Sequence, residues 1–111
     1  MEIIIESPHF TVGAELQEYT MQKVGKLAHF DEKVVKSEVL LKLEKSSTGD
    51  NKVCEIRMKT HHTNLFSSSK DNTFEEAIIQ CVHALEMQLK KYKLPGRGDG
   101  KKMEPENNTE E

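Results

Sequence analysis

The stretch TFEEAIIQCVHALEMQLKKYK at positions 73–93 decides how the C-terminal half of this chain folds. Its apolar residues recur every three or four positions, which predicts a helix with one apolar face. The members of that face are Phe74, Ile78, Cys81, Val82, Leu85, Leu89 and Tyr92. Thr73 followed by Glu76 predicts a capping box at the start, and Pro95 ends the helix. A helix with a single apolar face needs a sheet or another helix to cover it.

Two segments before this helix alternate between apolar and polar residues, as strands with one solvent-facing side do. They are VVKSEVLLKLEK at 34–45 and KVCEIRMKT at 52–60, joined by the turn-forming SSTGDN. The expected apolar faces carry Val39, Leu41 and Leu43 in the first segment and Cys54, Ile56 and Met58 in the second. A third strand, LFSSSK at 65–70, follows HHTN. Leu65 and Phe66 are adjacent in it, so one of the two is expected to be exposed.

The N-terminal part predicts a strand followed by a helix. MEIIIE at 1–6 is rich in β-branched residues and predicts a short strand that ends by Pro8. From about Val12 the apolar pattern takes a helical spacing. The residues that carry this spacing are Leu16, Tyr19, Thr20, Val24 and Leu27. Lys23 and Lys26 fall in the last turns of this helix, where cations suit the helix dipole.

The order of elements is therefore βαβββα, an α+β fold. A strand–helix–strand unit pairs its strands in parallel with a right-handed crossover, and the later strands are linked as hairpins. Because both helices have one apolar face, we expect them on one face of a four-stranded sheet. Their C-terminal halves can then share an edge of the molecule, with Lys23 and Lys26 in one helix and Lys90, Lys91 and Lys93 in the other.

Length and composition indicate one domain with a tail. The chain has 111 residues, and after Leu94 it holds only one large apolar residue, Met103. We therefore predict a folded domain at 1–94 and a flexible charged tail at 95–111. No run approaches the roughly 20 apolar residues of a membrane span, and MEIIIESPHF is unlike a secretory signal. The protein is expected to be cytoplasmic.

Catalytic or metal-binding chemistry has little support in the sequence. Neither His61, His62 nor His83 combines with a cysteine in a standard zinc spacing. PGRGDG follows a helix rather than a strand, so it is not a phosphate-binding loop of the nucleotide-binding type. Cys54 and Cys81 lack a C-x-x-C spacing and are predicted to be reduced core residues rather than a bridge. We expect neither an enzyme nor a metal, a cofactor or a small-molecule substrate.

Basic residues concentrate where the last helix ends, although the chain as a whole carries a net charge of −3. Six of its sixteen basic residues are Lys90, Lys91, Lys93, Arg97, Lys101 and Lys102. Lysine-rich clusters suit phosphate contacts rather than base reading, but lysines at a helix end are also common as partners of the helix dipole. The sequence shows neither an aromatic stacking platform nor an RNP motif. Recognition of single-stranded RNA by the common mode, in which bases stack on aromatic side chains, is therefore not expected.

Over residues 1 to about 93 the sequence resembles the bacterial ribosome hibernation-promoting factors, also called ribosome-associated translation inhibitors. The resemblance rests on the order and spacing of four segments. They are MEIIIES, LQEYTMQKVGKLAHFDE, SEVLLKLEK and DNTFEEAIIQCVHALEMQLKKYK. Lys23, Lys26 and Leu27 match a K-x-x-K-L pattern of the first helix, and Gln88, Leu89, Lys91 and Lys93 match a closing Q-L-x-K-x-K.

The resemblance implies a βαβββα fold like that of double-stranded-RNA-binding domains, in a short form without the second domain of the long members. It implies a protein that binds the small ribosomal subunit in the channel for mRNA and tRNA, blocks initiation and preserves idle ribosomes. The rRNA-binding residues implied are Lys23, Lys26, Lys90, Lys91, Lys93 and Arg97. Off the ribosome a monomer is expected. An alternative of a different class is a protein-interaction or chaperone-like module that uses the exposed sheet face and the acidic tail.

Overall fold

The computed structural model describes residues 1–29, 34–45 and 51–93, and of residues 92 and 93 only their place in the last helix. Along the chain the elements are β1 (Glu2–Glu6), α1 (Ala14–Gly25), the 3-10 helix η1 (Lys26–His29), β2 (Val34–Leu43), β3 (Lys52–Thr60), β4 (Asn64–Asp71) and α2 (Phe74–Lys93). The predicted order βαβββα and the α+β class are confirmed. The predicted tail at 95–111 lies outside the described residues.

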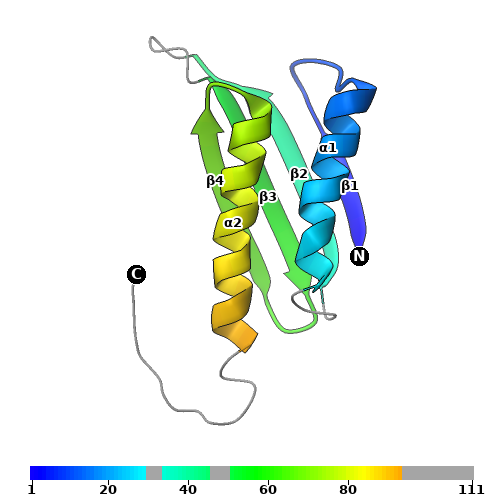
Figure 1. Ribbon diagram of the computed structural model, residues 1–111, viewed down its shortest axis with the longest axis vertical. Helices are drawn as coiled ribbons and strands as arrows, with labels where there is room; N and C mark the ends of the chain where they lie inside the picture. Colours follow the sequence, from blue (N-terminus) through cyan, green and yellow to red (C-terminus); the bar gives the residue numbers. More distant parts are fainter. Residues whose placement is uncertain (30–33, 46–50, 94–111) are drawn as a thin grey trace.

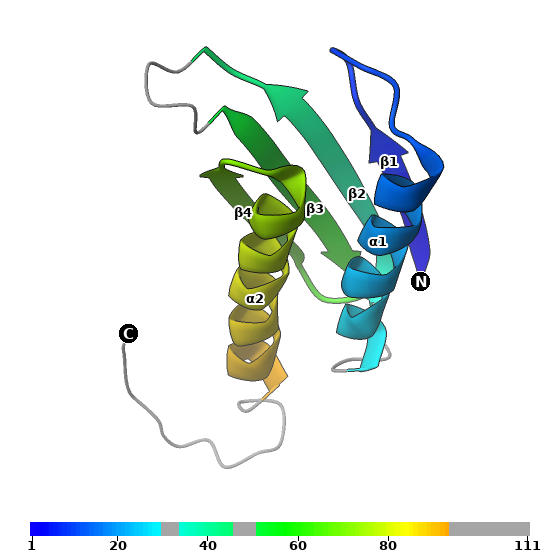
Figure 2. The same cartoon turned by 45° about the horizontal axis from the view of Figure 1, so that its top comes forward.

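The four strands form one sheet in the order β1-β2-β3-β4. Strand β1 is parallel to β2, and the other two pairs are antiparallel, as the crossover and hairpin rules require. Figures 1 and 2 show both helices on the same face of this sheet. The opposite face carries no described helix, so the sheet has one covered and one open face.

The core lies between the sheet and the two helices. Its fully buried side chains include Val24, Leu27, Val39, Leu41, Cys54, Ile56, Met58, Ile78, Cys81, Leu85 and Leu89. The predicted apolar faces of the helices and strands are confirmed at these positions. Leu43 is the exception, being 37% exposed, because it is the last residue of β2 at the margin of the sheet.

The two adjacent apolar residues of β4 lie on opposite faces of the sheet. Leu65 is buried against the helices, whereas Phe66 is 47% exposed on the open face. The pairing register places Leu65 opposite Met58 and Phe66 opposite Arg57. Because the residues of a paired strand alternate between faces, this register decides which of the two is buried.

The predicted capping box at the start of α2 is half formed. Thr73 Oγ1 accepts a hydrogen bond of 3.1 Å from the Glu76 main-chain N–H. The carboxyl group of Glu76 instead pairs with Asp71, the last residue of β4. Helix α1 starts at Ala14, two residues after the predicted start, and passes into η1 after Gly25.

Both cysteines are buried and free, as predicted. The Cys81 thiol donates a hydrogen bond to the carbonyl oxygen of Cys54, with a sulfur–oxygen distance of 3.0 Å. This bond joins α2 to β3 within the core. In the described parts of the chain, no helix is long and apolar enough to cross a membrane.

Candidate nucleic-acid interface

The C-terminal ends of both helices lie at the end of the molecule where β3 turns into β4 (Figures 1 and 2). The topology dictates this arrangement, since each helix follows a strand and runs back along the sheet. We call this end the basic pole. Its described members are Lys23, Lys26, His29, His61, His62, Lys90 and Lys91.

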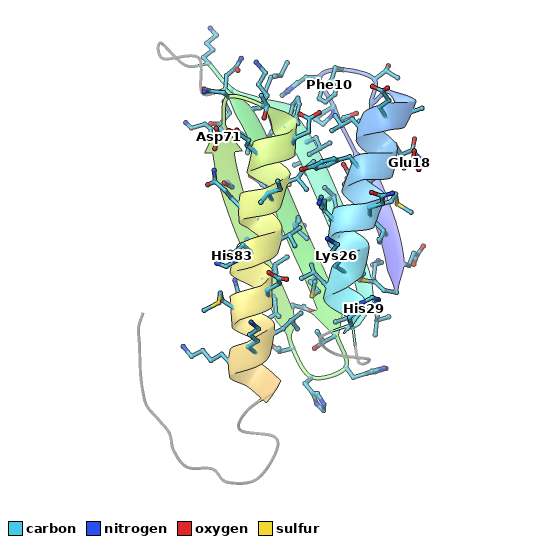
Figure 3. The ribbon with its side chains drawn as sticks, in the orientation of Figure 1. Phe10, Glu18, Lys26, His29, Asp71 and His83 are labelled. Atoms are coloured by element: carbon cyan, nitrogen blue, oxygen red, sulfur yellow. The ribbon has the colours of Figure 1, made fainter. Side chains whose placement is uncertain are left out.

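Helix α1 and η1 contribute three of these side chains. Lys23 is half-buried, and its Nζ lies 5.4 Å from the centre of the Tyr19 ring one turn earlier, a cation–π contact. Lys26 and His29, the first and last residues of η1, are exposed, and Figure 3 shows His29 at the end of the molecule that forms the basic pole. Burial, and then the nearby charges of Glu75 and Glu76, raise the pKa of Tyr19.

Helix α2 contributes Lys90 and Lys91, which are exposed near its C-terminus. The buried side of the helix is fixed by Leu85 and Leu89, 0% and 1% exposed, so the two lysines lie off the face that contacts the sheet. Lys93 belongs to α2, but its side chain is outside the described structure, as is Arg97. Of the six predicted site residues, the structure describes the side chains of four, Lys23, Lys26, Lys90 and Lys91, which lie in the C-terminal parts of α1 and α2 and in η1.

The turn between β3 and β4 adds His61 and His62, which the sequence suggested only as poor zinc ligands. Both are exposed. Thr60 Oγ1 accepts hydrogen bonds from the main-chain N–H groups of His62 and Thr63, at 3.1 and 2.9 Å, and donates one of 2.7 Å to the Thr63 carbonyl. These bonds hold the turn in one shape. The predicted order of strands and helices already implied that this turn lies at the same end of the molecule as the C-terminal ends of the helices.

The opposite end of the helical layer is acidic. Its members are Glu15, Glu18, Asp71, Glu75 and Glu76. Glu18 and Asp71 lie on the far side from His29 in Figure 3. A hydrogen bond from the Asn72 N–H, with others from Glu76 and Gln80, holds the pKa of Asp71 below its usual range. The hydrogen bond to Asp71 raises the pKa of Glu76. The first halves of the helices therefore carry more carboxylates than the second halves, so within the helical layer a polyanion is attracted more strongly to the basic pole.

This arrangement suits binding rather than bond-making chemistry. Among the described residues, no group of three or more His, Cys, Asp or Glu side chains could hold a metal ion. Exposed lysines on helix ends contact phosphates without reading sequence, and their local field acts within a Debye length of about 8 Å. A chain of net charge −3 can therefore still present a surface that attracts RNA.

Comparisons with known proteins agree with the fold. Residues 3–94 match the family described as Sigma 54 modulation protein / S30EA ribosomal protein. A ribosomal subunit interface protein from Coxiella burnetii aligns with a TM-score of 0.76 at 18% identity, over 85% of this chain and 99% of that one. The N-terminal domain of Protein Y from Thermus thermophilus aligns with a TM-score of 0.72 at 20% identity, over 83% and 99%. No curated protein sequence matches the chain. At these identities the structural likeness shows the fold.

Proposed function

The chain belongs to the Sigma 54 modulation protein / S30EA ribosomal protein family, and on that premise we propose that it binds the small ribosomal subunit in the channel for mRNA and tRNA. Membership of the family supports a ribosome-associated role in translation regulation and hibernation. The finer assignment, to the small subunit and to a block of initiation, is the proposal.

The observation that carries the proposal is the basic pole. Its lysines come from segments far apart in the sequence, Lys23 and Lys26 from one helix and Lys90 and Lys91 from the other. The topology directs the C-terminal halves of both helices to one end, while Glu15, Glu18, Glu75 and Glu76 lie in the first halves of the helices, and Glu86 of α2 lies 3.7 Å from His83. Folded rRNA presents phosphates from several strands at once, and a cationic end of this kind can contact them without base reading.

The proposed mechanism is occlusion. A protein seated where mRNA and initiator tRNA enter excludes both, so that its binding and initiation are mutually exclusive. No covalent step is needed, and the occupied subunit is preserved until the protein leaves. Arg97 and the rest of 95–111 are proposed to add secondary contacts, so that a chain ended at Leu94 still binds the subunit.

The experiment that tests the proposal is co-sedimentation through a sucrose gradient with purified small subunits. The test variant is Lys90→Glu/Lys91→Glu. The matched control is Lys45→Glu/Lys52→Glu, which makes the same change of net charge beside the β2–β3 turn at the opposite end of the sheet. We expect the wild type and the control to migrate with the subunit and the test variant to stay at the top. Circular dichroism establishes that both variants keep the fold.

Two results would contradict the proposal. If the wild type stays at the top of the gradient, the protein-interaction or chaperone-like alternative is favoured. If the Lys90→Glu/Lys91→Glu variant migrates with subunits as the wild type does, the basic pole is not the binding site. Toeprinting of initiation complexes then distinguishes a block of initiation from binding elsewhere on the subunit.

A further inference from the structure

An aromatic ring is exposed on the open face of the sheet, near the basic pole. Phe66 in the edge strand β4 is 47% exposed, although it is one of only four phenylalanines in the chain. The guanidinium carbon of its cross-strand neighbour Arg57 lies 5.9 Å from the ring centre. The Phe66 ring is therefore in contact with the Arg57 guanidinium group and is also partly open to solvent.

Charge on the open face is distributed unevenly. Among its carboxylates, Glu38 and Glu55 are engaged by lysines, with nitrogen–oxygen distances of 3.5 Å to Lys36 and 3.1 Å to Lys42, while Glu2 and Glu6 lie in β1 at the other edge of the sheet. Glu38 is also the β2 neighbour of Arg57 in the register. Across the remaining surface around the ring lie the exposed residues Arg57, Lys59, Asn64 and Ser68. Within the described chain, neither Arg57 nor Lys59 forms an ion pair, so this corner of the face is positive.

The corner is continuous with the basic pole. Gln88 Nε2 in α2 donates a hydrogen bond of 3.0 Å to the Phe66 carbonyl oxygen. Lys90 and Lys91 follow Gln88 within one turn of the helix, and on the other side His62 lies four residues before Phe66 in the adjoining turn. A strand of RNA held by the lysines can therefore pass around the β4 edge and reach the ring.

We propose that this corner binds an unpaired nucleobase of RNA, stacked on the Phe66 ring, with the adjoining phosphates on Arg57 and Lys59. The inference rests on the proposed function and adds to the lysine contacts a preference for RNA with an unstacked base beside a helix. The sequence shows no platform of several aromatic rings, but the strand register exposes this single ring. Bases of any sequence stack on an aromatic ring, and an arginine adds a cation–π contribution. The hydrogen-bonding side chains of Asn64 and Ser68 lie on the same face for contacts to the sugar or base edge.

The test uses a single-stranded RNA of about 12 nucleotides containing one 2-aminopurine, and a duplex of the same sequence without unpaired bases. Because a stacked base adds to the affinity, we expect Phe66→Leu to bind the single strand about tenfold more weakly, a loss of about 1.4 kcal/mol. Phe66→Tyr keeps the ring and is expected to bind as the wild type does. The wild type and Phe66→Tyr should quench the 2-aminopurine fluorescence and Phe66→Leu should not, while all three bind the duplex equally.

Each other outcome overturns the stacking site. A Phe66→Leu variant that binds and quenches like the wild type, or a wild type that fails to bind the single strand, excludes stacking on this ring. If Phe66→Leu weakens binding to the single strand and to the duplex equally, the substitution has altered the surface in general and the ring does not stack on a base. If the Phe66→Leu variant keeps its affinity for RNA but no longer co-sediments with small subunits, the ring contacts a ribosomal protein rather than RNA. Failure of the proposed function is seen separately, as a wild type that stays at the top of the gradient.

Discussion

The side-chain amide of Gln88 donates a hydrogen bond to the main-chain carbonyl of Phe66, with Nε2 and O 3.0 Å apart. The bond fastens the C-terminal part of α2 to the edge strand β4. It therefore fixes the lysines of the helix end relative to the open sheet face. The sequence singles out Gln88 as the first residue of the closing Q-L-x-K-x-K pattern but does not show its contact with β4.

Replacing Gln88 with alanine is expected to loosen the end of α2. The bond is partly exposed, so its loss should lower the free energy of unfolding by only about 0.5–1.5 kcal/mol. Amide hydrogen exchange in the last two turns of α2 should become faster, because local opening no longer breaks this contact. Gln22→Ala, on the exposed side of α1, is the control and should leave exchange in α2 unchanged. Unaltered exchange in the Gln88→Ala variant would show that the bond does not hold the helix end.

Leu85→Ala should be strongly destabilising. Leu85 is 0% exposed in the middle of the apolar face of α2, and truncating such a residue leaves a cavity. The expected loss is about 2–5 kcal/mol in the free energy of unfolding, measured by urea denaturation. Met87→Ala, two residues along at a side chain 54% exposed, should change it little. Equal effects of the two substitutions would mean that the buried face of the helix has been assigned wrongly.

The two thiols should be inert in the folded protein. The hydrogen bond between the two thiols raises the pKa of Cys54 and lowers that of Cys81, but both side chains are 0% exposed. Because a reagent must reach the sulfur to react, an aromatic disulfide reagent is expected to modify neither cysteine under native conditions and both after denaturation. The measurement is absorbance of the released thiolate with and without urea. Prompt release without urea would contradict the packing of β3 against α2.

Stability near the start of α2 should depend on acid pH through Asp71. Its pKa is lowered in the folded state, so its ionised form stabilises the fold above the usual carboxyl pKa of about 3.9. That contribution is lost as pH falls through the folded pKa. Glu76 has the opposite sign, since its raised pKa makes its contribution disappear as pH rises. In a Glu76→Gln background, Asp71→Asn should therefore lower Tm at about pH 7, and the difference should shrink as pH falls through the folded pKa of Asp71. A pH-independent difference would contradict the hydrogen bonding described at Asp71.

Binding to small subunits should weaken steeply with salt. Each lysine that neutralises a phosphate releases condensed counterions, so the logarithm of affinity falls linearly with the logarithm of salt concentration. Lys91→Ala should reduce the magnitude of that slope by about one, because one phosphate contact is lost. Lys45→Ala, beyond the end of β2 and away from the basic pole, should leave the slope unchanged. A slope that Lys91→Ala does not alter would exclude Lys91 from the phosphate contacts.

The element order, the faces of the helices and most of the core follow from the sequence because they depend on near neighbours. A helix brings residues three and four apart to one side, and a strand brings alternate residues to one side. Leu85 and Met58 could be placed in the core from this spacing alone, and both are fully buried. Lys23, Lys26, Lys90 and Lys91 could be expected toward one end because each helix follows a strand and runs back along the sheet to cover its apolar face.

Contacts between distant segments were decided only by the tertiary structure. Strand pairing places Phe66 opposite Arg57 and buries Leu65, a choice that adjacent apolar residues leave open in the sequence. Tertiary contact also gives Glu76 the Asp71 carboxyl as its partner in place of the start of its own helix. The physical reason is that local spacing specifies which side of an element is apolar. Register and packing between elements specify what each polar side chain meets.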